Sequence, residues 1–208
     1  MLAHNQSKPP SVDDYGVFLN IPYDHAFVSL YLAYIAGLSA FRLEPRATLQ
    51  IPGGERRLDR ILDLIRSCRY SFHDLSRVEL NLKRPATPRF NMPFELGLAV
   101  AWQRFGGTRH TWCVFESRGW RAGKSLSDLS GTDVYVHGGT PAGIFRELCN
   151  ALVLADHQPS VAQMATIYRK LRRCLPNLMK SAGAKSAFKA RVFADLIVVA
   201  KGLASRPA

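Results

Sequence analysis

The sequence predicts an α/β fold, in which a mainly parallel sheet of five strands carries helices on both faces and is followed by a basic helical extension. Three observations lead to this prediction. Apolar runs of strand length alternate with longer helical patterns, which is typical of parallel sheets. The 208 residues, 47% of them hydrophobic, are enough for one globular domain with an appended part. The last fifty residues carry two amphipathic stripes and a strong excess of basic side chains.

The first segment of the alternation is a strand followed by a buried helix. Residues 17–21 form a short apolar run that stops at Pro22, because proline has no N–H to donate to a central strand. Residues 25–39 are apolar nearly all round, as expected of a helix that is buried on every side. Segment 41–51 follows as the second strand.

The middle of the chain adds two helices and a strand. After a turn at 53–54, residues 55–68 repeat apolar side chains at i, i+3, i+4 and i+7, which predicts an amphipathic helix. Residues 70–76 read as a short strand that ends in polar residues. A loop with three prolines, residues 78–93, leads into a helix from about residue 93 to 104, where Pro93 suits a first helical turn.

Two further strands and three helices complete the chain. Residues 110–117 and 133–137 are the fourth and fifth strands, and residues 141–154 form a helix after the Gly138–Gly139 turn. Two helical stripes follow, separated by Pro176 and Gly183. Their members are Val161, Met164, Tyr168, Leu171 and Leu175 in the first stripe, and Phe188, Val192, Leu196 and Val199 in the second.

These boundaries divide the chain into a lead (1–14), an α/β domain (15–158) and a basic helical extension (159–208). Of the net charge of +12, residues 1–158 contribute +3, and residues 159–208 contribute +9 from 10 Lys and Arg against Asp195 alone. Such a field attracts polyanions, so a nucleic acid is a candidate partner. The alternative is a solvated helical face or one that docks on an acidic protein, since no known nucleic-acid-binding motif accompanies the charge.

Several classes of protein are disfavoured by what the sequence lacks. Its four cysteines lie far apart, so no structural zinc site is expected, and reduced thiols are predicted. No secretory signal or membrane span is predicted, and a cytoplasmic protein is the default expectation. Glycine-rich phosphate loops and the motifs of zinc proteases, α/β-hydrolases and β-lactamases are missing, so neither a bound cofactor nor a metal is expected.

Polar side chains gather where three of the predicted segments meet. In an open parallel sheet, ligands bind beyond the carboxyl ends of the strands, near the point where the strand order reverses. The first strand, the third strand and the start of the helix near residue 93 all place polar groups at that edge. The candidates are Asn20, Pro22, Tyr23, Asp24, His73, Asp74, Ser76, Arg77, Asn91, Met92 and Glu95.

Glu95 is the first candidate for chemistry. Apolar neighbours surround it, and Gly97 permits close approach of a ligand, so a partly buried carboxylate is expected. Such a group can stabilise or attack an electron-poor sugar carbon, and Asp74 is the natural second carboxylate. The alternatives are structural: Glu95 would interact with the helix dipole, and Asp74 would form a loop turn.

Two further residue types have catalytic or binding interpretations beside structural ones. His73 titrates near neutral pH in its unperturbed state and could carry a proton, although a strand histidine is more often a hydrogen-bonded packing residue. Four arginines have a fixed fork that suits a phosphate group, and some of them are expected to be simply solvated: Arg46, Arg69, Arg77 and Arg89.

The runs SCRYSFHDLSR (67–77) and PRFNMPFELGLAVAW (88–102), with the opening VFLNIPYD (17–24) and SLSDLSGTDVYVHGG (125–139), carry a resemblance. The chain resembles the nucleoside 2-deoxyribosyltransferase-like and Toll/interleukin-receptor-like (TIR-like) proteins over residues 15–152. The resemblance implies a Rossmann-like sheet of the flavodoxin or TIR type. It also implies cleavage or transfer at an N-glycosidic bond, with Glu95 as catalytic glutamate and Asp74 as the aspartate that orients the substrate.

The substrate implied by this resemblance is a nucleotide, a nucleoside or NAD. The proline-rich basic insertion after Ser76 and the basic extension are not features of the small metabolic members. They favour a specialised role, such as that of a bacterial antiphage effector. The same resemblance leaves open a homo-oligomer that completes the pocket. The alternative functions are a sensor that binds a nucleotide without cleaving it, and an adaptor that binds nucleic acid or a protein partner.

Overall fold

The computed structural model has a five-stranded sheet in which every neighbouring pair of strands is parallel. It describes residues 12–50, 55–78, 80–81, 87–106, 109–120, 123–124, 126–129 and 131–205. The sheet order is β2-β1-β3-β6-β7. The predicted α/β class and parallel sheet are therefore confirmed, and the order is that of a flavodoxin-like, Rossmann-like fold. The strands are β1 (Asp13–Asn20), β2 (Glu44–Arg46), β3 (Cys68–Asp74), β6 (Thr111–Glu116) and β7 (Val134–Val136).

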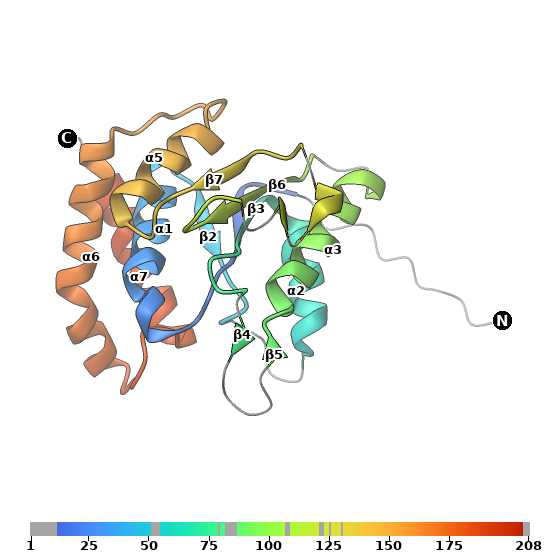
Figure 1. Cartoon of the computed structure of the whole chain (residues 1–208). Helices are drawn as coiled ribbons and strands as arrows, with labels where there is room; N and C mark the ends of the chain where they lie inside the picture. Colours follow the sequence, from blue (N-terminus) through green and yellow to red (C-terminus); the bar gives the residue numbers. More distant parts are fainter. Residues whose placement is uncertain are drawn as a thin grey trace.

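Helices cover both faces of this sheet (Figure 1). On one side lie α2 (Arg57–Ser67) and α3 (Asn91–Phe105), which contact each other. On the other side α1 (Val28–Ala40) is packed by three helices of the second half of the chain. These are α5 (Pro141–Ala151), α6 (Val161–Ser181) and α7 (Ala190–Ala204).

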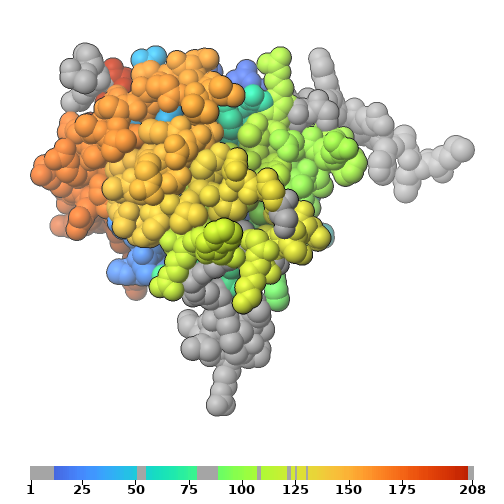
Figure 2. All heavy atoms as spheres, turned by 45° about the horizontal axis from the view of Figure 1, so that its top comes forward, coloured from blue at the N-terminus to red at the C-terminus, as the bar shows by residue number. Residues whose placement is uncertain are grey.

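The helix α1 is at the centre of the core. Eleven of its thirteen residues are buried, because the sheet lies on one side and α5, α6 and α7 lie on the others. The apolar stripes of α6 and α7 therefore belong to the same hydrophobic cluster as α1 and the sheet. In the space-filling view the residues of α5 and α6, yellow-orange to orange, lie directly against each other (Figure 2).

Three elements differ from the sequence-based expectations. The second strand covers only residues 44–46 of the expected 41–51. The segment expected to be a loop contains a two-stranded antiparallel ribbon, β4 (Leu80–Asn81) and β5 (Thr87–Pro88). Pro176 lies inside the continuous helix α6 rather than between two helices. It is exposed there, so water can satisfy the carbonyl group that loses its N–H partner, while buried Leu171 anchors the helix one turn earlier.

The order of the strands places a reversal between β1 and β3. The chain runs from β1 outward to β2 and then returns to β3 on the other side of β1. Asn20, the last residue of β1, is in register with His73, and Asp74 is in register with Phe115 of β6. The carboxyl ends of β1 and β3 thus flank the position where open α/β sheets bind ligands.

The described residues also include two short 3-10 helices, η1 (His25–Phe27) and η2 (Ser127–Leu129). None of the helices in the described ranges is long and apolar enough to cross a membrane. The turn expected at residues 53–54 lies outside the described residues, as does most of the lead at 1–14.

Candidate functional site

A cleft of about 380 Å³ opens beyond the carboxyl end of β1, on the side of the sheet that carries α2 and α3. Its volume lies within the range of small-molecule sites, about 300–1,000 Å³. The cleft brings together seven of the residues that the sequence singled out, Arg89 among them, and adds three others. It is lined by Asn20, Ile21, Pro22, Tyr23, Thr48, Arg57, Arg89, Asn91, Met92 and Glu95.

Glu95 is the acidic side chain among the described residues that line the cleft. It lies in the second turn of α3, and the residue is only 3% exposed. Burial raises its pKa to about 7, and the nearby Arg57 opposes part of this rise. The Arg57 guanidinium is 4.0 Å from Oε1, so it contacts Glu95 as a loose ion pair. Both protonation states of Glu95 are therefore accessible at neutral pH.

Asn20 is held in one orientation by two acceptors. Its Nδ2 group donates to Nδ1 of His73 at 2.9 Å and to the carbonyl oxygen of Met92 at 3.2 Å. Because both hydrogens of the amide are used, its Oδ1 atom is the group that it presents to the cleft as an acceptor. A hydroxyl group of a ligand is a suitable donor to this oxygen.

His73 does not line the cleft but lies behind Asn20 in a buried chain of hydrogen bonds. Burial, assisted by nearby His110, lowers the pKa of His73 to about 3, so its ring is neutral. Since Nδ1 accepts from Asn20, Nε2 carries the hydrogen and donates to Ser71 Oγ at 2.9 Å. Ser71 continues to His110, which donates from Nδ1 to the carbonyl oxygen of Cys68. The arrangement fits a positioning role for His73 rather than proton transfer.

The other walls of the cleft supply hydroxyl and guanidinium groups. Burial raises the pKa of Tyr23 to about 12, so its hydroxyl stays protonated, and it lies 3.3 Å from Thr48 Oγ1. Arg57 and Arg89 are each about half exposed or less, and both face the cleft. The cleft therefore combines hydroxyl-binding groups with two cations that suit a negatively charged substituent.

Asp74 lies outside this cleft, contrary to the expectation that the two carboxylates share one pocket. It is 0% exposed and faces α1, where Tyr34 donates to Oδ2 at 2.9 Å. The backbone N–H of Ser76 donates to Oδ1 at 2.9 Å, and Nε2 of His137 lies 3.1 Å from Oδ2. Successive strand residues point to opposite faces, so Asp74 points away from the face on which His73 meets Asn20.

Asp74, His137 and Ser76 do not form the relay of a serine hydrolase. Nε2 of His137 is near both Asp74 and Ser76 Oγ, at 3.1 and 3.2 Å, whereas a relay needs the two partners on different ring nitrogens. The other nitrogen, Nδ1, accepts from the backbone N–H of Gly139 at 3.1 Å. The cluster instead joins the end of β3 to the turn after β7.

Asp24, another expected site residue, lies beside the cleft. Asp24 accepts a hydrogen bond from the backbone N–H of Phe27 at 3.1 Å and so caps η1. Its Oδ2 atom is 3.6 Å from Arg77 and 3.5 Å from Arg89. Arg77 and Ser76 line a separate hollow on the opposite side of the sheet ends.

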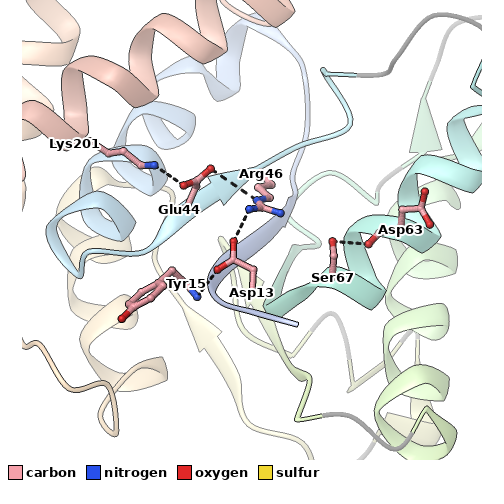
Figure 3. Close-up of polar contacts among 7 residues, drawn as sticks. All are labelled: Asp13, Tyr15, Glu44, Arg46, Asp63, Ser67 and Lys201. Carbon is pink, nitrogen blue, oxygen red and sulfur yellow. Dashed lines mark hydrogen bonds and ion pairs between the residues drawn. The ribbon is translucent and has the colours of Figure 1, made fainter. Parts of the chain in front are cut away.

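Arg46 is placed far from these groups. Its guanidinium pairs with Asp13 at the start of β1 and lies 3.9 Å from Glu44. Figure 3 shows this ion network, in which Lys201 of α7 contacts Glu44 as well. Arg46 does not line the cleft, whereas Arg57 and Arg89 do.

Thr48 and Arg57 were not among the residues that the sequence pointed to. Arg57 reads as part of the solvated face of its helix, but it is the first residue of α2 and therefore lies near the edge where β2 ends. The signal that could have found it is this position after a strand, not the helical period. No group of three or more potential metal ligands occurs within the described ranges.

Comparisons with known proteins add no family. No protein-family profile, no curated protein and no solved structure matches the chain. The parallel sheet with its flavodoxin-like strand order is therefore the level at which this chain is classified.

Proposed function

We propose that the cleft at the end of β1 cleaves or transfers at the N-glycosidic bond of a nucleotide, a nucleoside or NAD, with Glu95 as the catalytic carboxylate. The proposal is carried by one observation: the buried carboxylate of Glu95 lies where the strand order reverses. The same cleft holds groups that can accept hydrogen bonds from ligand hydroxyls, and two arginines. The resemblance of residues 67–77 and 88–102 to nucleoside 2-deoxyribosyltransferase-like proteins points to the same chemistry.

The chemistry required of this site is stabilisation of positive charge on a ribose. When the C1′–N bond breaks, its electron pair leaves with the base and the sugar becomes oxocarbenium-like. Ionised Glu95 would stabilise this carbon or bond to it, and water or a second acceptor would then attack C1′. In the hydrolytic case the proton released by water protonates the departing base of a nucleoside or nucleotide, whereas nicotinamide leaves NAD already neutral and the proton passes to solvent.

The other residues of the cleft have binding roles in this proposal. Oδ1 of Asn20 would accept from a ribose hydroxyl, with Tyr23 and Asn91 as further contacts, and Arg57 and Arg89 would take a phosphate. Asp74 would act as a positioning residue, since its three hydrogen bonds hold the end of β3 rather than reaching the cleft.

The test is release of free base by the full chain, measured by chromatography with NAD, nucleoside monophosphates and deoxynucleosides as substrates. Glu95→Gln keeps the size of the side chain and removes its charge, so we expect a loss of at least about a hundredfold with folding intact. Glu147→Gln is the matched control. Glu147 is also a mostly buried helical glutamate with an arginine partner, Arg146 at 2.8 Å, and it lies on α5 outside the cleft.

A substrate turned over equally well by wild type and Glu95→Gln would contradict the catalytic role of Glu95. Binding of a nucleotide without any product would favour the second candidate function, a nucleotide sensor. One observation favours that alternative: Glu95 is the single carboxylate among the described lining residues, whereas glycosidases commonly use two.

We also propose a partner for the outer side of α6. Its apolar residues Met164, Ile167 and Leu171 are buried against α1, so the opposite side faces solvent. The helix α6 has no acidic residue. Counted from Arg169, basic side chains on the solvent side occur at i, i+3, i+4 and i+11, and Lys170 adds one more. This surface, the α6 basic face, fits the phosphates of a nucleic acid. Its exposed members are Arg169, Lys170, Arg172, Arg173 and Lys180.

A further inference from the structure

A second hollow, of about 210 Å³, lies at the same edge of the sheet but on the side that carries α1. The segments that follow β3, β6 and β7 each contribute to it, and η1 with the first turn of α1 closes one wall. Its lining residues are Ala26, Phe27, Leu30, Ser76, Arg77, Ser117, Arg118 and Gly139. The hollow is thus built from parts of the chain that are far apart in sequence.

The polar groups of this hollow are donors. Arg77 and Arg118 provide two guanidinium groups, Ser76 and Ser117 provide hydroxyls, and no carboxylate is among the described lining residues. Arg118 is exposed and has no hydrogen bond or ion pair with any other described residue. Nε of Arg77 lies 3.6 Å from Oδ2 of Asp24. This loose contact uses one nitrogen of the guanidinium, and its other N–H groups are available to a ligand.

Ser76 gives the strongest sign that the hollow takes an acceptor. The residue is 7% exposed, and its Oγ lies 3.2 Å from Nε2 of His137. Since Nδ1 of His137 accepts from the Gly139 N–H, Nε2 is a donor, with Asp74 Oδ2 at 3.1 Å and Ser76 Oγ at 3.2 Å as its acceptors, so Ser76 Oγ cannot donate to this nitrogen. The hydroxyl hydrogen of Ser76 therefore remains to be donated, and no described protein group receives it. A buried donor of this kind needs a partner in the hollow.

We propose that this hollow binds a phosphate group, as inorganic phosphate or as part of a phosphate monoester. Two arginine forks and serine hydroxyls suit a tetrahedral dianion, because each oxygen can accept more than one hydrogen bond. The hollow is smaller than the usual range for whole small-molecule ligands, about 300–1,000 Å³, so only the phosphate itself is enclosed.

This phosphate site is separate from the Glu95 cleft. Asp24 lies between the two and pairs with Arg77 of the hollow and Arg89 of the cleft, while none of the lining residues is shared. The proposal does not depend on the reaction assigned to Glu95. Variants of one site can therefore be read independently of variants of the other.

The test is isothermal titration calorimetry of the full chain with inorganic phosphate at low ionic strength. Wild type is expected to bind one phosphate, and Arg118→Ala and Ser76→Ala are each expected to weaken binding by about tenfold or more. Arg118 has no partner in the described structure, so its loss should leave the fold intact. Arg146→Ala is the matched control, because Arg146 is an exposed arginine on α5 outside the hollow and should leave binding unchanged.

Two results would overturn the proposal. One is the absence of any phosphate binding by wild type. The other is binding that survives Arg118→Ala and Ser76→Ala but is lost in Arg57→Ala, which would place the anion in the Glu95 cleft.

A second titration, with ribose 5-phosphate and a nucleoside 5′-monophosphate, distinguishes the sources of the phosphate. Tighter binding of the nucleotide, still weakened by Arg118→Ala, would identify a nucleotide as the carrier. Equal affinity for all three probes, with the same sensitivity to Arg118→Ala, would identify free phosphate.

Discussion

Two carboxylates at one edge of the sheet have opposite surroundings. Asp74 accepts from Tyr34 and from the Ser76 N–H, and lies within reach of His137, so both of its oxygens have hydrogen-bond partners in the closed interior. Glu95 is almost as buried, but among the described residues its polar contact is Arg57 alone, at 4.0 Å. An incompletely compensated buried carboxylate costs folding free energy, and such costs are often found at functional sites.

The first prediction concerns stability and pH. Burial raises the pKa of Glu95 to about 7 from 4.5, so the folded state holds a proton that the unfolded state has lost between these values. Glu95 therefore costs nothing below pH 4.5, and its cost grows to about 3 kcal/mol above pH 7, at about 1.4 kcal/mol per pKa unit. Glu95→Gln removes this cost, so its stability relative to wild type should rise with pH across this window. Urea unfolding at several pH values measures it.

His73, which lies behind Asn20, lowers the stability of the folded state at acidic rather than at alkaline pH. This effect is the same in wild type and in Glu95→Gln, so it cancels when the two are compared. The pKa of His73 is lowered to about 3, so this residue destabilises the folded state as pH falls from 6.5. Glu147→Gln again serves as the control. A difference between Glu95→Gln and wild type that is constant from about pH 5 to about pH 8.5 would mean that Glu95 is not perturbed by burial.

At the scale of elements, two glycines in the middle of helices lead to a second prediction. A Cβ atom added to Gly37 of α1 would lie 2.3 Å from Cδ1 of Leu148 on α5, whereas one added to Gly97 of α3 meets nothing within 4 Å. Gly97→Ala should stabilise the protein by roughly 0.5–1 kcal/mol through helix propensity. Gly37→Ala should destabilise it by about 1–3 kcal/mol, because Leu148 is fully buried and has no room to move.

The two variants control each other, since the substitution is identical and both positions are helical. Thermal unfolding of the pair gives the sign directly. An increase in stability for Gly37→Ala similar to that for Gly97→Ala would show that α1 and α5 are packed less closely than the structure has them.

The elements that could be predicted from sequence are those with a local signal. The period of Leu58, Ile61, Leu62 and Ile65 gave the helix α2, and the apolar residues all round α1 predicted its burial on every side. The predicted break between two helices at Pro176 was wrong. A proline usually ends a helix, and only the tertiary packing shows that α6 continues through it. The ribbon β4–β5 has two residues in each strand, too few for a periodic signal.

The candidate site could be predicted only to the level of the strand ends. Asn20 and Glu95 were found because Asn20 ends a strand and Glu95 lies near the start of a helix at the same edge. Asp74 was expected beside them, but the alternation of side chains directs it to the face of α1. The direction of a side chain at a strand end depends on its register with the neighbouring strand, here Asn20 with His73, which one sequence does not reveal.

At the scale of the whole molecule, charge and packing are divided between the two sides of the C-terminal helices. Both α6 and α7 pack on α1, and their buried residues belong to the main hydrophobic cluster. On α7, Arg191 pairs with Asp195 at 3.0 Å, and Lys201 contacts Glu44. The α6 basic face has no ion pair with any described acidic residue, so its charges are available to a partner.

The last prediction is that the α6 basic face binds duplex nucleic acid through phosphates alone. The part of the extension that the structure describes exposes no large aromatic side chain for base stacking, which favours a duplex over a single strand. Four or five phosphate contacts predict a slope of about −4 when log affinity is plotted against log salt for duplex DNA, and about −3 for single strands. Fluorescence anisotropy with a generic duplex at several salt concentrations measures this slope.

Charge reversal separates this surface from the net charge of the protein. Arg172→Glu with Arg173→Glu should nearly abolish binding and flatten the salt dependence, because both lie on the exposed side of α6. Arg104→Glu with Arg109→Glu changes the net charge equally at exposed positions away from α6 and should lower the affinity only slightly. Equal losses in the two double variants would mean that overall charge, not the α6 basic face, attracts the duplex. Binding through phosphates releases counterions and is therefore strongest at low salt. No binding even at low salt would contradict a nucleic-acid partner, and the α6 basic face would then contact an acidic protein or solvent.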